Sequence, residues 1–352
     1  MFRIRIQNKK KCIWYCSAVV SFLLFLLLLG WTNHLANTQD AQQMAGRWSE
    51  KKDVAQISCF FSSKAEVTED TIQSFEYSLK NMLQEASITE TSENPSARLW
   101  VDAYSADGKI TLVNGKNTLD ANAIGIGGDF FMFHPLKLIT GAYFSGNDLM
   151  QDYCIIDQDA AWQLFGSNDV VGMTVYIGNV PHIVTGVVQR PDSRMDKAAG
   201  LNSTVVYVSY ETLSAYGTNN GINHYEIVMP NPVDEFAYGK VKEGIGIDEK
   251  NVEIVENSRR YSLPNRIKTI LAFGTRSMNG KAIIYPYWEN LARGYEDIIA
   301  LLTVFMLLLL LYPVVTIIWC FVHWWRHKGW TLKDVWPVSY THLRAHETKA
   351  NL

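Results

Sequence analysis

Few residues in this sequence have the types and the spacing that chemistry requires. The closest approach to a phosphate-binding loop is Gly274 to Ala282, which is one residue too long and has alanine where a hydroxyl should bind Mg²⁺. His323 and His327 stand four residues apart, but no carboxylate stands near them in the sequence to complete a metal site. The aspartates between residues 129 and 159 do not follow the spacing of an EF-hand loop. We therefore expect no catalytic residue, no cofactor and no metal, and hence no enzyme.

The cysteines narrow the class of protein further. Of the five, only Cys59 and Cys154 lie outside the strongly apolar segments of the chain. They could form a disulfide, but two cysteines without a spacing pattern are weak support for one, and two separate buried thiols are the preferred interpretation. Either way, a small disulfide-stapled scaffold and a cysteine-rich zinc site are excluded.

Hydropathy is distributed unevenly along the 352 residues, whose net charge is −3. Residues 12–31 contain no charge, and residues 298–325 form a second apolar stretch that includes Pro313. A helix needs about 20 such residues to cross the ~30 Å hydrocarbon core of a membrane. The first stretch is also longer than the apolar core of a usual signal peptide. The sequence therefore predicts two transmembrane helices, the first of them an uncleaved anchor.

Basic residues indicate how the two spans are oriented. The N-terminal segment, residues 1–11, carries lysines and arginines and no acid, and Arg326, Lys328 and Lys333 follow the second span. Under the positive-inside rule both flanks are cytoplasmic. Residues 32–297 are then extracytoplasmic, and a bacterial plasma membrane is the expected location.

Between the spans we expect a domain of the α+β class. A strand-helix-strand unit is predicted within residues 54–116, with Thr68 capping a helix that has apolar residues at helical spacing. These apolar positions are Ile72, Phe75, Leu79, Met82 and Leu83. A second such unit is predicted within residues 224–260. Together the two units should form one lobe, which we call porter-like.

Residues 117–223 are rich in short β runs and turns and should form a mostly β lobe inserted into the porter-like lobe. The glycines at 125, 127 and 128 are expected to form a turn. Residues 32–52 and 263–273 are expected to be helical stalks that connect the domain to the membrane.

The C-terminal segment differs from the rest of the chain. Residues 338–348 read VSYTHLRAHET, which resembles the translation of a common transposon-end sequencing adapter. We interpret residues 338–352 as an assembly artefact and expect the natural chain to continue beyond Pro337.

A pattern of some fifty residues resembles the extracytoplasmic core domain of MacB-type ABC transporter permeases, with FtsX proteins as more distant relatives. It contains a glycine-aromatic element, a helix that ends in Leu-Phe-Gly, a Val-Gly pair and a hairpin that closes on Val-x-Gly-Val. The matching residues are Gly141, Tyr143, Phe144, Asp148, Ala161, Leu164, Phe165, Gly166, Val171, Gly172, Val184, Gly186 and Val187.

The resemblance implies an architecture and a partner rather than a reaction. Members of the family have a porter-like lobe with an inserted β lobe, and a cytoplasmic segment after the second span contacts an ATPase. Here that segment would be residues 326–337, with Leu332, Val335 and Trp336 as its apolar contact face. A separate ABC ATPase, which would bind the ATP, and a homodimer or heterodimer of permeases are the implied partners, within membrane lipid and without nucleic acid.

The alternative function is a two-span membrane sensor or an FtsX-like regulator of cell-wall hydrolases. Two further apolar spans in the intact gene would favour the permease, whereas a signalling module after the second span would favour the sensor.

Overall fold

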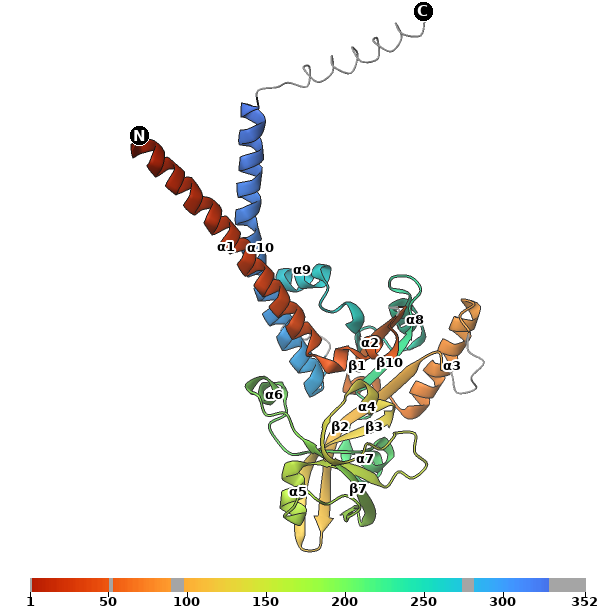
Figure 1. Ribbon diagram of the computed structural model, residues 1–352. Coiled ribbons are helices and arrows are strands. Elements are labelled where there is room, and N and C mark those ends of the chain that lie inside the picture. Colours follow the sequence, from red (N-terminus) through yellow and green to blue (C-terminus); the bar gives the residue numbers. More distant parts are fainter. Residues whose placement is uncertain (1, 51–52, 90–97, 274–281, 329–352) are drawn as a thin grey trace, which may run out of the picture. The chain divides into compact units, whose positions relative to one another are not determined.

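The structure is a computed structural model that describes residues 2–50, 53–89, 98–273 and 282–328 (Figure 1). The chain divides into two units. Residues 1–32 and 302–352 make up one, here called the helical unit, and residues 33–301 make up the other, here called the outer domain.

Two helices, α1 (Phe2–Asn37) and α10 (Tyr287–His327), supply the helical unit. Both are long and apolar enough to cross a membrane, and they contain the predicted spans. Within this unit Ser21 Oγ donates a hydrogen bond to the Leu309 carbonyl at 2.7 Å, and the rings of Trp14 and Trp319 meet edge to face at 5.0 Å. Short polar side chains that bond across two helices are a usual means of packing in lipid.

One mixed sheet of eleven strands organises the outer domain, with the order β11-β1-β10-β2-β3-β8-β5-β7-β4, while β6 pairs with β2 and β7 and β9 pairs with β2. The strands are β1 Val54–Phe61, β2 Val101–Asn114, β3 Asn117–Gly128, β4 Lys137–Gly141, β5 Tyr153–Asp157, β6 Thr174–Ile177, β7 Val180–Gln189, β8 Val205–Ser209, β9 Thr218–Asn219, β10 His224–Pro230 and β11 Val252–Glu256.

Short helices cover this sheet and separate its apolar clusters. They are α2 Met44–Trp48, α3 Glu69–Glu85, α4 Phe130–Phe133, α5 Gln158–Phe165, α6 Arg194–Ala199, α7 Tyr210–Tyr216, α8 Phe236–Gly244 and α9 Leu263–Leu271, with 3-10 turns η1 Asp40–Gln42, η2 Ser63–Ala65 and η3 Asn257–Arg259. The predicted helix after Thr68 is confirmed as α3, and its apolar residues pack with α8 against β1 and β10. A second cluster gathers α5 and α7, and a third gathers α2, α4 and the start of α10.

A long hairpin, β2–β3, joins the strands of the two predicted lobes into the one sheet (Figure 1). The start of β2 pairs with β10 and its end pairs with β6. The predicted turn at the glycine-rich segment is wrong, because Gly125, Gly127 and Gly128 are the last residues of β3 and pair with Ala106, Tyr104 and Ala103. Glycine is needed at 127 because a Cβ there would lie 2.0 Å from the Tyr104 ring.

The first predicted stalk is not one helix. After α1 ends at Asn37 the chain turns through η1 and α2, because Met44 and Ala45 are buried against the sheet. The Gln56 side chain stabilises the break, since it accepts a hydrogen bond from the Met44 amide at 2.9 Å and donates one to the Ala41 carbonyl at 2.6 Å. In the second predicted stalk α9 forms, and none of its residues is buried.

Both outer-domain cysteines, Cys59 on β1 and Cys154 on β5, are free and buried, in agreement with the preferred interpretation of two separate thiols. Burial raises the pKa of both thiols, that of Cys154 to about 12. Neither is therefore a reactive thiolate.

Candidate functional site

The residues singled out from the sequence do not come together in one site. Leu332, Val335 and Trp336, predicted to contact an ATPase, lie outside the described residues, as does most of the glycine-rich run at 274–282. His327 Nδ1 lies 2.8 Å from the carbonyl oxygen of His323, a contact within one helix turn.

Two of the aspartates noted in the sequence, Asp157 and Asp129, have structural partners. Asp157 accepts hydrogen bonds from the amides of Ala160 and Val205 and pairs with Arg190 at 2.5 Å, which ties β5, α5 and β8 together. Burial raises the pKa of the Asp157 carboxyl despite these partners. Asp129 pairs instead with Arg98 at 2.5 Å.

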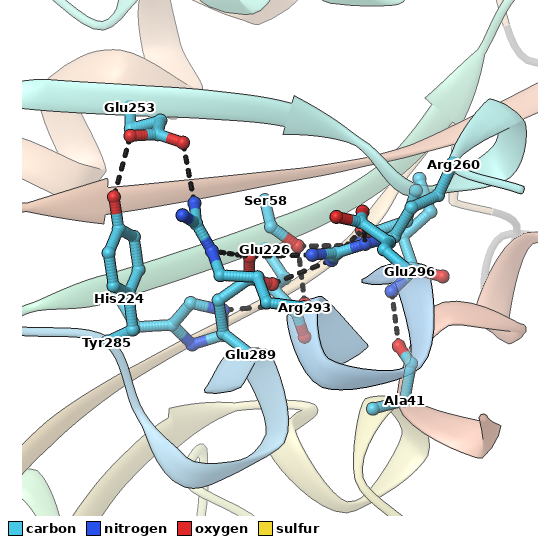
Figure 2. A network of polar contacts seen from close by, with 12 residues as sticks. Ala41, Ser58, His224, Glu226, Glu253, Arg260, Tyr285, Glu289, Arg293 and Glu296 are labelled. Carbon is cyan, nitrogen blue, oxygen red and sulfur yellow. Dashed lines mark hydrogen bonds and ion pairs between the residues drawn. The ribbon is translucent and has the colours of Figure 1, made fainter. Parts of the chain in front are cut away.

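A network of buried ion pairs lies at the N-terminal turns of α10, which we call its base, where the sequence predicted no site (Figure 2). Arg260 follows η3 and is almost wholly buried, with 2% of its side chain exposed. Its two terminal nitrogens donate to both oxygens of Glu289 at 2.7 Å, and its Nε donates to Glu296. Glu289 and Glu296 both belong to α10. The guanidinium therefore joins the end of the sheet to the first turns of that helix by a bidentate ion pair, the strongest geometry for an arginine and a carboxylate.

A second arginine extends the network along α10. Arg293 Nε donates to Glu289 at 2.7 Å, and its Nη2 donates to Glu253 of β11 at 2.6 Å. Glu253 also accepts a hydrogen bond from the Tyr285 hydroxyl at 2.6 Å, and the Arg293 guanidinium lies 3.8 Å from the centre of the Tyr285 ring. Two arginines from different segments therefore share one carboxylate, Glu289, which is only 1% exposed. The set of Glu253, Arg260, Tyr285, Glu289, Arg293 and Glu296 is called the α10 junction below.

Burial and pairing act in opposite directions on the charges of the junction. Burial lowers the pKa of Arg260 and of Arg293, but the neighbouring acidic groups, Glu289 foremost, together outweigh burial and raise both pKa values above their usual value. Burial, followed by the hydrogen bond to Glu253, raises the pKa of the Tyr285 hydroxyl. Each arginine therefore stays charged, as a buried pair requires.

From the junction a chain of hydrogen bonds leads into the sheet. Arg260 Nη1 donates to Asn257 Oδ1 at 3.1 Å, and Asn257 Nδ2 donates to Ser58 Oγ at 2.6 Å. Ser58 in turn donates to Glu226 Oε1 at 2.5 Å. Through these contacts the base of α10 is connected to the central strands β1 and β10, and not only to the edge strand β11.

This arrangement is suited to transmitting movement between α10 and the sheet rather than to catalysing a reaction. Two-pronged ion pairs fix both distance and orientation, and buried networks of this kind are rigid when all members have partners. The only sequence signal was the i, i+4 spacing of Glu289 and Arg293 on one helix face. Arg260 is 29 residues from Glu289, and no local pattern links them.

Comparison with known proteins agrees with this architecture. The family model of the MacB-like periplasmic core domain matches residues 23–254. The macrolide export ATP-binding/permease protein MacB of Chromobacterium violaceum is 32% identical over 99 residues, which are 28% of this chain and 15% of that protein. The same protein of Pasteurella multocida is 30% identical over 98 residues, 27% of this chain and 14% of that protein. The matched segments thus span less than a fifth of the length of these relatives.

Among solved structures, the periplasmic region of MacB from Actinobacillus actinomycetemcomitans covers 61% of this chain and 92% of its own, with a TM-score of 0.39 and 18% identity. With the family model matching well over half of the chain and two long apolar helices flanking the outer domain, the chain belongs to the MacB-like periplasmic core domain family of ABC transporter permeases and is a membrane protein with a large extracytoplasmic domain.

Proposed function

We propose that this chain is the permease subunit of a MacB-like ABC transporter complex and transmits ATP-driven motion from a separate ATPase to its outer domain. The observation that supports the proposal is the α10 junction. Helix α10 runs without interruption from Tyr287 to His327, so that the residues of the junction and those of the second predicted span belong to one helix. A shift of this helix would be passed through Arg260 to η3 and β1 rather than absorbed by a flexible loop.

The proposal includes two protein partners. The apolar face of Leu332, Val335 and Trp336 would bind the ATPase in the cytoplasm, and a second permease, identical or related, would complete the complex. ATP would bind to the ATPase and not to this chain. In this mechanism no residue of the permease makes or breaks a bond.

The test uses the full chain in lipid nanodiscs together with an ABC ATPase from the same genome. Hydrogen exchange of backbone amides is measured with ATP trapped on the ATPase and with ADP. We expect the nucleotide to change protection in η3 and in the first turns of α10. Arg260→Lys should keep ATPase binding but reduce the nucleotide-dependent change in exchange. A lysine ammonium cannot form a bidentate pair with Glu289 and bind Glu296 at the same time.

Two further variants complete the design. Trp336→Asp should abolish copurification with the ATPase, whereas Arg259→Lys, at an exposed neighbouring position, should behave like the parent chain. If no ATPase binds, or if trapped ATP leaves exchange unchanged throughout the outer domain, the permease mechanism is wrong. A two-span sensor, or a hydrolase regulator that works without ATP, would then be favoured.

A further inference from the structure

Three side chains beyond the α10 junction converge on one point inside the outer domain. His134 caps the end of α4, and His224 and Glu226 point to the same face of β10 because they are two residues apart on one strand. His134 Nε2 lies 2.8 Å from Glu226 Oε2, and His224 Nε2 lies 3.4 Å from Glu226 Oε1. All three side chains are at most 2% exposed.

The atoms that face one another are left without well-aligned hydrogen bonds. Among the described residues, His134 Nε2, His224 Nε2 and Glu226 Oε2 are buried polar atoms that no aligned hydrogen bond satisfies. Such atoms are costly in a protein interior and call for a specific explanation. The donor sites of two imidazoles and a carboxylate, all within 4.8 Å of one another, are a set that a positive ion would satisfy.

We propose that His134, His224 and Glu226 bind a divalent transition-metal ion of the zinc type. Two imidazoles and one glutamate are an established ligand set for zinc, with bonds of about 2.0–2.2 Å. Ligand atoms on one tetrahedral ion at such distances lie roughly 3.3 Å apart. The contacts of 2.8 and 3.4 Å go to the two different oxygens of Glu226, and one ligand atom from each residue lies within 4.8 Å of the others, so the side chains would draw together around an ion. The fourth position is left for a water molecule.

The surroundings of the cluster support this assignment. Metal-ligating histidines and carboxylates are usually held by a second hydrogen bond. Here His224 Nδ1 lies 3.3 Å from Ser105 Oγ, and Ser58 donates to Glu226.

Metal binding at this cluster would reach α10. The ring of Trp288, in the first turn of that helix, lies with its centroid 4.2 Å from that of His134 and 5.1 Å from that of His224. A bound ion would hold both imidazole rings in place, and Trp288 packs against these two rings. It would also join α4 to β10, two segments far apart in sequence. This role goes beyond the proposed transport function and is tested without any ATPase.

The experiment measures metal on the full chain purified in detergent. The protein is stripped with a chelator, equilibrated with Zn²⁺ against a competing chromophoric chelator, and analysed by mass spectrometry of the metal. We expect about one tightly bound ion per chain, the number that one such ligand set holds. His134→Gln and Glu226→Gln should each weaken binding by more than about 100-fold, because even an outer-shell partner of a ligand contributes about 10–100-fold.

Two control variants and a visible spectrum distinguish metal binding at this cluster from binding at other histidines. His182→Gln removes another buried histidine, whose ring nitrogens lie 3.0 Å from the Val180 carbonyl oxygen and 3.1 Å from Thr212 Oγ1, and it should retain the ion. A His323→Ala, His327→Ala chain should retain it as well. Co²⁺ on the parent chain should show the intense visible bands of a tetrahedral site. If the parent chain binds no metal, or if His182→Gln loses as much as His134→Gln, the proposal is overturned.

Discussion

Replacing Arg260 by methionine removes the cation at the centre of the α10 junction while keeping most of the side-chain volume. Glu289 and Glu296, two turns apart on one face of α10, would then lose the cation that they share, and only Arg293 would remain on Glu289. Removal of one partner from a buried ion pair destabilises a protein by about 3–5 kcal/mol, because the remaining charge is left uncompensated. Since about 1 kcal/mol moves the unfolding midpoint of a large domain by about 2–4 °C, we expect a decrease of about 6–20 °C.

The assay is thermal unfolding of the full chain in detergent, followed by tryptophan fluorescence, with Arg259→Met as the matched control. Arg259 is adjacent in sequence but 40% exposed, and it pairs with Asp234, which is 80% exposed. An exposed pair contributes about 0–1 kcal/mol, so the control should move the midpoint by less than about 4 °C. In Arg260→Met, Glu289→Leu, which removes both charges, part of the lost stability should return. If Arg260→Met and Arg259→Met unfold at the same temperature, the buried junction does not hold α10 to the sheet.

Two further predictions concern α3 and the glycines. Burial, followed by the neighbouring Asp102 carboxylate, raises the pKa of Glu76 to about 8, whereas an unfolded glutamate titrates near about 4.3. The folded chain therefore loses stability as pH rises from about 4.3 through about 8. The unfolding temperature of Glu76→Gln should exceed that of the parent chain at about pH 9 but not at about pH 5. If the difference between the two unfolding temperatures is the same at both pH values, the prediction is wrong. Gly127→Ala should cost about 1–3 kcal/mol, because its Cβ would meet the Tyr104 ring at 2.0 Å. Gly239→Ala, inside α8 with nothing within 4 Å of its Cβ, should instead stabilise by about 0.5–1 kcal/mol. A midpoint of Gly127→Ala above that of Gly239→Ala would refute both assignments.

The helices were predictable where a local pattern carries the information. Hydropathy over about 20 residues located both candidate spans, and the spacing of Ile72, Phe75, Leu79 and Leu83 located α3, because one side of that helix is buried against the sheet. The long β2–β3 hairpin was not predicted. Its Asp107-Gly108 pair has the composition of a turn, yet both residues lie in mid-strand. Gly108 is required there because a Cβ would lie 2.3 Å from the Thr218 carbonyl oxygen.

The sequence alone determined that two apolar segments flank one large α+β domain, and the motif around Leu164 and Gly166 indicated the family. These properties depend on composition, periodicity and short spacings, all of which are local. Only the tertiary structure decided that Arg260 meets Glu289, and that His134 meets Glu226 across 92 positions of sequence. Buried charges and imidazoles acquire partners when distant segments pack together, and burial in a medium of low polarity then gives those contacts their strength.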